Sequence, residues 1–309
     1  MSQEKIFFEE RNYDYIQTGF QSLDETITGF GKGELIFIGG AGGPGVSYDF
    51  IINLAYNISK QFYEECTENV LRKKSVGFFS LLKPKYVLCQ QILSIIKGIP
   101  FTLNKDNHSN EYFEFGVRYT KFEGKNFCFY LDLYIEDTPT LTINSIRERI
   151  KQMVDIHNTR VVFIDCLELI QREKSFEYKI EEISNIIVEL KRMAREFNIS
   201  IVVLSELSVR DLLLKENTAP TLKDIKYHNV LSIADIIMFV YYHYYFLSQR
   251  APFLNASIEQ KESWKSKMNT FVSLVDIDVD KSREEKELYG SLLCYERTIH
   301  RFKDYMTED

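Results

Sequence analysis

Cysteine is sparse in this sequence, and the cysteine spacing is not typical of a disulfide-bonded or metal-binding protein. The five cysteines are Cys66, Cys89, Cys128, Cys166 and Cys294, far apart and without a C-x-x-C pair. Because no secretory leader precedes them, we expect reduced thiols in a cytoplasmic protein. A chain of 309 residues buries enough surface on folding to be stable without disulfides or structural metals.

Long apolar runs and a basic charge balance are also missing. The longest runs, 161–164 and 236–240, are far too short to cross a bilayer, so we expect no membrane partner. The net charge of −7 provides no overall field that would attract nucleic acid. This lowers the expectation of strong DNA binding but leaves room for a local basic groove.

What the sequence does have is an alternation of apolar runs and helical periods from Gly33 onward. The predicted strands are 34–38, 76–80, 127–135, 160–164, 200–205 and 235–241, and the predicted helices are 50–62, 85–97, 143–158 and 177–197. This alternation predicts an α/β fold, a mostly parallel sheet with helices on both faces. We interpret residues 1–16 as an arm and 246–269 as a polar insertion. Segments 270–276 and 289–296 are expected to pair as an antiparallel hairpin.

A glycine loop follows the first predicted strand. Residues 40–47 read G-A-G-G-P-G-V-S, and this frame between a strand and a helix is typical of a phosphate-binding loop. Glycines let backbone N–H groups turn toward a phosphate, and the helix N-terminus adds its dipole. The candidate nucleotide-binding residues are Gly40, Gly42, Gly43, Gly45 and Ser47, and the Ser47 hydroxyl stands where a Mg²⁺ ligand belongs.

The residue before Ser47 lacks the expected chemistry. A phosphate-binding loop has lysine there, whereas this chain has Val46, which has neither charge nor donor. A charge-assisted hydrogen bond to phosphate is worth about 1.5–3 kcal/mol. We therefore expect triphosphate binding to be weakened without necessarily being abolished. A glycine-rich turn with no ligand stays open as the alternative.

Several further segments occur in a recognisable order. They are 15–24 (Y-I-Q-T-G-F-Q-S-L-D), 33–38 (G-E-L-I-F-I), 78–81 (F-F-S-L), 133–139 (L-Y-I-E-D-T-P), 162–169 (V-F-I-D-C-L-E-L), 203–208 (V-L-S-E-L-S) and 234–239 (A-D-I-I-M-F). Together they resemble the C-terminal, RecA-like motor domain of the DnaB-type replicative DNA helicases. The resemblance implies a RecA-like P-loop NTPase fold over residues 17–309, with ATP and Mg²⁺ as the family's ligands.

The departures from the family's pattern fall on its catalytic positions. The glutamate that activates water follows F-F-S-L in the family and is Leu82 here, an apolar residue that cannot accept a proton. The glutamine that couples nucleotide state to DNA contact is Glu206 here. The Walker B aspartate is kept as Asp165, which with Ser47 would hold Mg²⁺ if the ion binds.

The resemblance also implies a Lys-x-Arg finger in the closing hairpin. Asp276, Asp278 and Asp280 crowd that region, and the nearest cations, Lys281 and Arg283, lie beyond them. Carboxylates facing a triphosphate would repel it. Losing a general base costs about 10²–10⁴-fold and losing an arginine finger about 10³–10⁵-fold. We therefore expect a degenerate site with no catalytic residues.

Family members grip single-stranded DNA with two loops that face the channel of the ring. The candidates here are Arg172, Lys174, Lys179, Lys223, Lys226 and His228. Beside them, Phe176 and Tyr227 would suit base stacking, so weak contact with single strands is expected. Mixed charge on solvated loops is the alternative interpretation.

Three functions stay open at this stage. The first is a pseudo-ATPase that acts as a DNA-binding or scaffold protein in DNA replication or DNA metabolism, with weak ATP and Mg²⁺ binding or none. The second is an active ATP-dependent helicase with divergent catalytic residues, and the third is a purely structural partner of a true helicase. The expected partners are a further copy of the chain or a replication protein, which the aromatic arm would contact.

Overall fold

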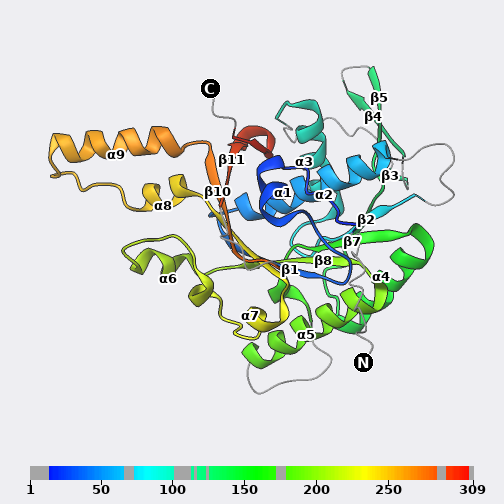
Figure 1. The fold of residues 1–309 in the computed structure, drawn as a ribbon. Coiled ribbons are helices and arrows are strands. Elements are labelled where there is room, and N and C mark those ends of the chain that lie inside the picture. Colours follow the sequence, from blue (N-terminus) through cyan, green and yellow to red (C-terminus); the bar gives the residue numbers. More distant parts are fainter. Residues whose placement is uncertain are drawn as a thin grey trace, which may run out of the picture.

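One large sheet with helices on both faces forms the body of the protein (Figure 1). The computed structural model describes residues 14–65, 73–100, 113–114, 117–122, 125–171, 179–283 and 290–305. Within these ranges, nine strands follow the order β12-β11-β10-β9-β1-β8-β7-β2-β6. Their bounds are β1 Leu35–Ala41, β2 Ser75–Phe79, β6 Leu133–Glu136, β7 Thr159–Ile164, β8 Ser200–Glu206, β9 Ile236–Tyr241, β10 Leu274–Lys281, β11 Ser291–Glu296 and β12 Arg301–Asp304.

The strand directions confirm the predicted sheet. Neighbouring strands from β9 through β1, β8, β7 and β2 to β6 are parallel. The three C-terminal strands then extend the sheet in the antiparallel sense, with β10 against β9 and β11 against both β10 and β12. The parallel strands all have their carboxyl ends at the same edge of the sheet. In open α/β sheets, ligands bind just outside this edge.

One predicted strand is wrong. Residues 127–135 form two strands, because β5 (Lys125–Tyr130) belongs to a separate small sheet with β4 (Val117–Phe122) and β3 (Phe113–Glu114). The chain leaves that sheet at Leu131 and Asp132 and enters the large one as β6, where the Val76 N–H donates to the Asp132 carbonyl at 2.8 Å. No glycine or proline marks the break, so the apolar run gave no turn signal.

Helices cover the two faces because strand side chains alternate between them. Ile36 and Ile38 of β1 enter one core, and Leu35 and Phe37 enter the other. On the first face lie α1 Gln21–Ile27, α2 Val46–Glu64 and α3 Lys85–Lys97; on the second lie α4 Ile143–His157, α5 Lys179–Phe197, α6 Val209–Leu214 and α7 Val230–Ile233. Short 3₁₀ turns occur at η1 Leu167–Leu169, η2 Leu222–Asp224 and η3 Arg297–Ile299.

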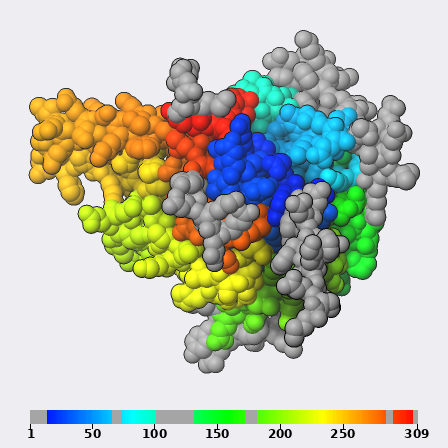
Figure 2. Space-filling view, in the orientation of Figure 1, coloured from blue at the N-terminus to red at the C-terminus, as the bar shows by residue number. Residues whose placement is uncertain are grey.

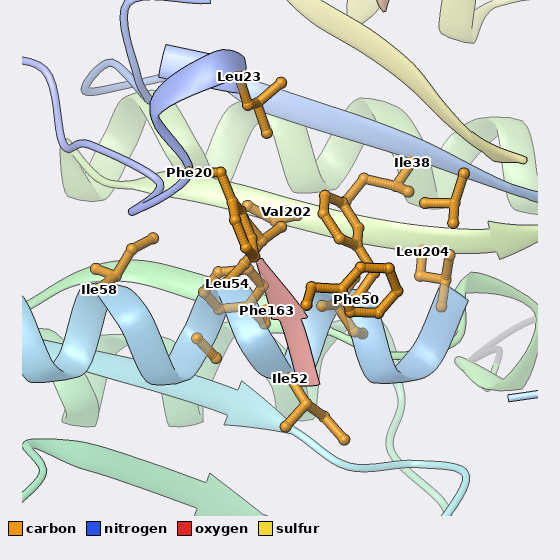
Figure 3. Close-up of a cluster of buried hydrophobic side chains, with 14 of the residues drawn as sticks. Phe20, Leu23, Ile38, Phe50, Ile52, Leu54, Ile58, Phe163, Val202 and Leu204 are labelled. Carbon is orange, nitrogen blue, oxygen red and sulfur yellow. The ribbon is translucent and has the colours of Figure 1, made fainter. Parts of the chain in front are cut away.

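Aromatic contacts anchor helix α2, which begins at the glycine loop. The Phe50 ring stacks on Phe20 at 5.9 Å between centroids and meets Phe302 edge-on at 5.6 Å. Figure 3 shows Phe50 among Leu54, Phe163 and other fully buried side chains of this core. Elements from both ends of the chain therefore hold the helix that carries the loop.

Helices α8 (His243–Gln249) and α9 (Ile258–Phe271) project from the body and contain most of the predicted insertion (Figures 1 and 2). The Trp264 indole donates to the Leu247 carbonyl at 2.9 Å and joins the two helices. The turn between them exposes Phe253 and Leu254. Among the residues that the structure describes, no helix combines the length and the apolar character needed to span a bilayer.

The predicted arm lies mostly outside the described residues, which begin at 14. Its last two residues pack on the body. Ile16 is buried and pairs with Phe30 through two backbone hydrogen bonds, while the Arg283 guanidinium lies 4.4 Å from the centre of the Tyr15 ring.

Candidate phosphate-binding site

The glycine loop joins the end of β1 to the start of α2. Gly43 and Gly45 have φ angles of 75° and 87°, the left-handed region that glycine adopts without strain. At Gly40 a Cβ atom would lie 2.6 Å from a carboxylate oxygen of Glu206, and at Gly42 it would lie 2.7 Å from the Val46 Cβ. The loop therefore has the backbone shape that the sequence predicts, with neighbours too close for larger residues.

The two residues that open α2 differ in what they offer a ligand. Val46 is buried in the first core and presents no donor. Ser47 is fully buried, and its hydroxyl makes no hydrogen bond of good geometry, although it is close enough to Glu206 to act on the pKa of that carboxyl. A buried hydroxyl without a well-formed hydrogen bond is unusual, and a ligand in the loop would supply one. The loop backbone and Ser47 thus fit a phosphate with its Mg²⁺. Val46, which stands at the lysine position, offers a phosphate no contact.

Asp165 follows β7 at the same sheet edge and is fully buried. Its carboxylate accepts hydrogen bonds from the backbone N–H groups of Leu81 at 2.8 Å and Leu82 at 3.1 Å. Burial raises the pKa of Asp165 to about 7, although these two donors act in the opposite direction. Asp165 therefore holds the segment after β2 in place, at the position that the resemblance assigns to a Mg²⁺ ligand.

Glu206 ends β8 directly beside the loop, and the N–H of Leu207 donates to the Gly40 carbonyl at 2.9 Å. Burial is the largest cause that raises the pKa of Glu206 to about 7, and the charge of Glu168 adds to it, while the Ser47 hydroxyl opposes the rise. Solvent still reaches Glu206 despite the protein around it. Above neutral pH this carboxylate puts negative charge next to the site.

Other side chains near the loop offer no obvious base. Leu82 is 46% exposed and apolar. Glu168 accepts hydrogen bonds from the Ser205 hydroxyl at 2.5 Å and the Tyr227 hydroxyl at 3.4 Å. The Cys166 thiol also donates to Glu168 at 3.5 Å, and a carboxylate that already accepts three hydrogen bonds is less available to a water molecule.

The cations of the closing strands are used within the chain. Lys281 and Arg283 have the Lys-x-Arg spacing of the expected finger at the end of β10. Lys281 donates to the carbonyls of Leu231 at 2.8 Å and Ala234 at 2.5 Å. Arg283 binds the Glu34 carboxylate and donates to the Ile27 carbonyl at 2.6 Å.

The acidic side chains before them lie on β10. Asp276 contacts His243 at 2.5 Å. Burial, with the charges of Asp276 and Asp280 as lesser causes, raises the pKa of Asp278 to about 6. All three acidic side chains, Asp276, Asp278 and Asp280, belong to a strand of the large sheet.

The DNA candidates fall into two groups. Arg172 and Lys174 lie outside the described residues, as does Phe176, and Lys179 is the first residue of α5. By contrast, Lys223, Lys226 and His228 are exposed on the segment that leads into α7. These three lie on one exposed surface segment.

Tyr227 was expected to stack on bases, and this is wrong. Its side chain is only 7% exposed and its hydroxyl points to Glu168. An aromatic residue between two exposed neighbours is ambiguous in sequence, because a loop that folds back buries alternate side chains.

Three features near the loop gave little or no sequence signal. The Tyr245 ring covers Gly43, where an added Cβ would meet it at 2.5 Å. Lys83 places its ammonium 4.0 Å from the centre of the Tyr48 ring. The third is a polar network, in which Asp49 accepts from Gln91 Nε2 at 3.0 Å, Tyr295 OH at 2.5 Å and His300 Nδ1 at 2.8 Å. Its members are too distant in sequence for spacing to connect them.

Comparison with known proteins agrees with a RecA-like domain whose glycine loop lies at the end of the first sheet strand. A solved structure titled as a DnaB-like replicative helicase and its interactions with primase superposes with a TM-score of 0.70 at 19% identity, covering 96% of this chain and 63% of that one. A KaiC-like protein of Pyrococcus horikoshii superposes with a TM-score of 0.56 at 14% identity, covering 95% and 100%. At these identities the likeness concerns the fold.

The sequence comparisons give the family. The model of the DnaB-like helicase C-terminal domain matches residues 15–304. The replicative DNA helicase DnaB of Rickettsia prowazekii (strain Madrid E) is 33% identical over 270 residues, which are 87% of this chain and 54% of that protein. This chain belongs to the DnaB-like helicase C-terminal domain family. It spans about half the length of the curated relatives that it matches.

Proposed function

We propose that this chain is a helicase-derived protein of DNA replication or DNA metabolism whose site does not turn over ATP, and that it acts as a DNA-binding or scaffold protein. The observation that carries the proposal is that apolar residues occupy two positions of the site, the one for the phosphate-binding lysine and the one for the general base. Val46 is buried where a phosphate-binding lysine belongs, and Leu82 stands where the resemblance implies a general base.

The magnitudes favour an inactive site over a slow motor. Loss of a general base alone costs about 10²–10⁴-fold, and the contribution of a finger is about 10³–10⁵-fold. Here the finger cations, Lys281 and Arg283, both bind groups of their own chain. Such losses are not additive, but the larger alone takes an enzyme of about 10 s⁻¹ to roughly one turnover in hours.

Nucleotide binding is a separate matter from turnover. The loop backbone would hold the phosphates, and Ser47 and Asp165 would hold Mg²⁺. Bound Mg²⁺ would neutralise phosphate charge. Because Val46 removes one charge-assisted hydrogen bond, the expected affinity is weak.

Two observations favour the alternative of an active helicase. The Lys-x-Arg spacing of Lys281 and Arg283 is intact, and the Ser47 hydroxyl has no well-formed hydrogen bond among the described residues. If a neighbouring subunit drew these cations into its own site, part of the lost catalysis would return.

Three measurements on the full chain test the proposal. Thermal unfolding with millimolar Mg²⁺-ATP should show a small stabilisation, because a ligand that prefers the folded state raises stability by mass action. The same sample should release no phosphate.

Binding of labelled single-stranded DNA should be weak, with a shallow dependence on salt, because few cations release few counterions. Tight or salt-insensitive DNA binding would contradict the DNA part.

A pull-down with and without nuclease separates the DNA-binding form of the proposal from a purely structural partner. A replication protein that is retained only when DNA is intact supports a DNA-binding role. Retention after nuclease treatment supports direct contact between proteins.

A further inference from the structure

The Lys83 side chain places a positive charge beside the first turn of α2, the helix that begins at the glycine loop. Its Nζ lies 4.0 Å from the centre of the Tyr48 ring, and Tyr48 directly follows Ser47. A cation over an aromatic face is attracted by the ring, so this contact holds the ammonium near the loop. The residue itself follows Leu82, whose backbone N–H binds Asp165.

The backbone around Lys83 is fixed from several sides. The Ser80 hydroxyl donates to the Lys83 carbonyl at 2.7 Å, and the Tyr48 hydroxyl lies 3.4 Å from the same Ser80 oxygen. The N–H of Ser80 donates to the Glu136 carbonyl at 2.8 Å. The segment that presents Lys83 is thus tied to α2 and to β6, and the position of its side chain follows from that framework.

The ammonium lies within electrostatic reach of the carboxylate at the metal position. Burial lowers the pKa of Lys83, while the charges of Asp49 and Asp165 oppose this shift. In return, the charge of Lys83 acts to lower the pKa of Asp165. Asp49 already accepts three side-chain hydrogen bonds, and Asp165 accepts two from the backbone. Neither carboxylate has a direct ion pair with Lys83 among the contacts that the structure describes.

We propose that Lys83 supplies the phosphate-binding cation that Val46 does not, so that the loop takes a nucleoside di- or triphosphate with an ammonium delivered from the segment after β2. This inference rests on the proposed weak nucleotide site and names the residue responsible for it. A movement of the lysine side chain from the Tyr48 ring toward the loop would exchange a cation–π contact for a charge-assisted hydrogen bond, which is the stronger of the two.

The test compares binding of adenosine, ADP and ATP to the full chain and to three variants by calorimetry. Lys83→Met removes the charge and keeps most of the side-chain length, Lys83→Arg keeps the charge, and Lys85→Met is the matched control two residues later. Lys85 serves because its contact with Asp137 is made by the backbone N–H, which the substitution leaves intact.

We expect Lys83→Met to weaken ATP and ADP binding about tenfold or more, with Lys83→Arg restoring most of the loss and Lys85→Met binding as the parent does. Adenosine, which has no phosphate, should bind equally to all four proteins, and this distinguishes lost charge from a distorted site. Repeating the titrations with EDTA in place of Mg²⁺ should preserve the difference, because the lysine charge is part of the protein.

The two ways to fail are distinct. If the parent chain binds neither ADP nor ATP at millimolar concentration, the weak nucleotide site fails, and this inference fails with it. If the parent binds and Lys83→Met binds with the same affinity, only the role of Lys83 is overturned. Equal losses for adenosine and ATP would also overturn it, because a phosphate contact cannot weaken a ligand without phosphate.

Discussion

The Glu206 carboxylate and the Ser47 hydroxyl converge on Gly40. A Cβ atom on that glycine would lie 2.6 Å from the carboxylate oxygen and 2.7 Å from the hydroxyl oxygen. One of the two groups is the residue that would hold Mg²⁺, and the other is an acid where the resemblance implies an uncharged amide. Within a few ångströms, the loop therefore has beside it a hydroxyl that suits the proposed Mg²⁺ contact and a carboxylate that would oppose a bound phosphate.

Removing the Glu206 charge should strengthen nucleotide binding. At pH 8 most of this carboxylate is ionised, since its pKa is about 7. Glu206→Gln should then raise the affinity for ATP by roughly tenfold, because a nearby like charge at the protein surface costs on the order of 1–4 kcal/mol. Calorimetric titration measures this, with Glu216→Gln on an exposed residue as the control. An unchanged affinity would mean that Glu206 does not face the phosphates.

Restoring one residue of the loop should separate binding from turnover. Val46→Lys adds the missing phosphate contact, so we expect ATP affinity to rise about tenfold or more. Hydrolysis should stay flat, because Leu82 still offers no base. Affinity and phosphate release are measured on the same preparation. A robust ATPase from this single change would show that another carboxylate serves as base, with Glu206 as the first to examine.

The Asp49 network should be a major source of stability. Asp49→Ala would leave the donors of Gln91, Tyr295 and His300 without their acceptor in a buried place. We expect the free energy of unfolding to fall by about 3 kcal/mol or more, measured by urea denaturation. The control is Asp155→Ala, which breaks an exposed ion pair with Lys151 and should cost less than about 1 kcal/mol. Equal losses for both variants would contradict the role given to Asp49.

Asp278 should make stability depend on pH in a defined direction. Its pKa is raised from 3.8 to about 6, so the folded state holds this proton more tightly than the unfolded state. Stability from this group is therefore present below about pH 4 and is lost as pH rises to about 6. Asp278→Asn should match the parent near pH 4 and exceed it above pH 6, by about 1–2 kcal/mol after allowance for solvent screening. A gain that is the same at all pH values would exclude the titration as its cause.

The sequence predicted the parts of the fold that depend on continuous patterns. The apolar runs gave strands β7, β8 and β9, and helix α3 begins and ends where its period predicts, at Lys85 and Lys97. The break at Leu131 and Asp132 was missed because no turn residue marks it. Lys83 and the Asp49 network could not be predicted, since their partners come together only through the sheet topology. A glycine loop is visible in sequence; which side chains surround it is decided by packing.

ATP turnover by the full chain, with Mg²⁺ and single-stranded DNA, tests the central claim most directly. Phosphate release is followed alongside Ser47→Ala, which removes the hydroxyl proposed to hold Mg²⁺ and so reveals any activity from a contaminant. The account predicts the same rate for both proteins, below about 0.1 s⁻¹, because Leu82 offers no base where the family's glutamate activates water and the loop has no lysine of its own. A rate above about 0.1 s⁻¹ that Ser47→Ala abolishes would contradict it and identify this chain as a working ATPase.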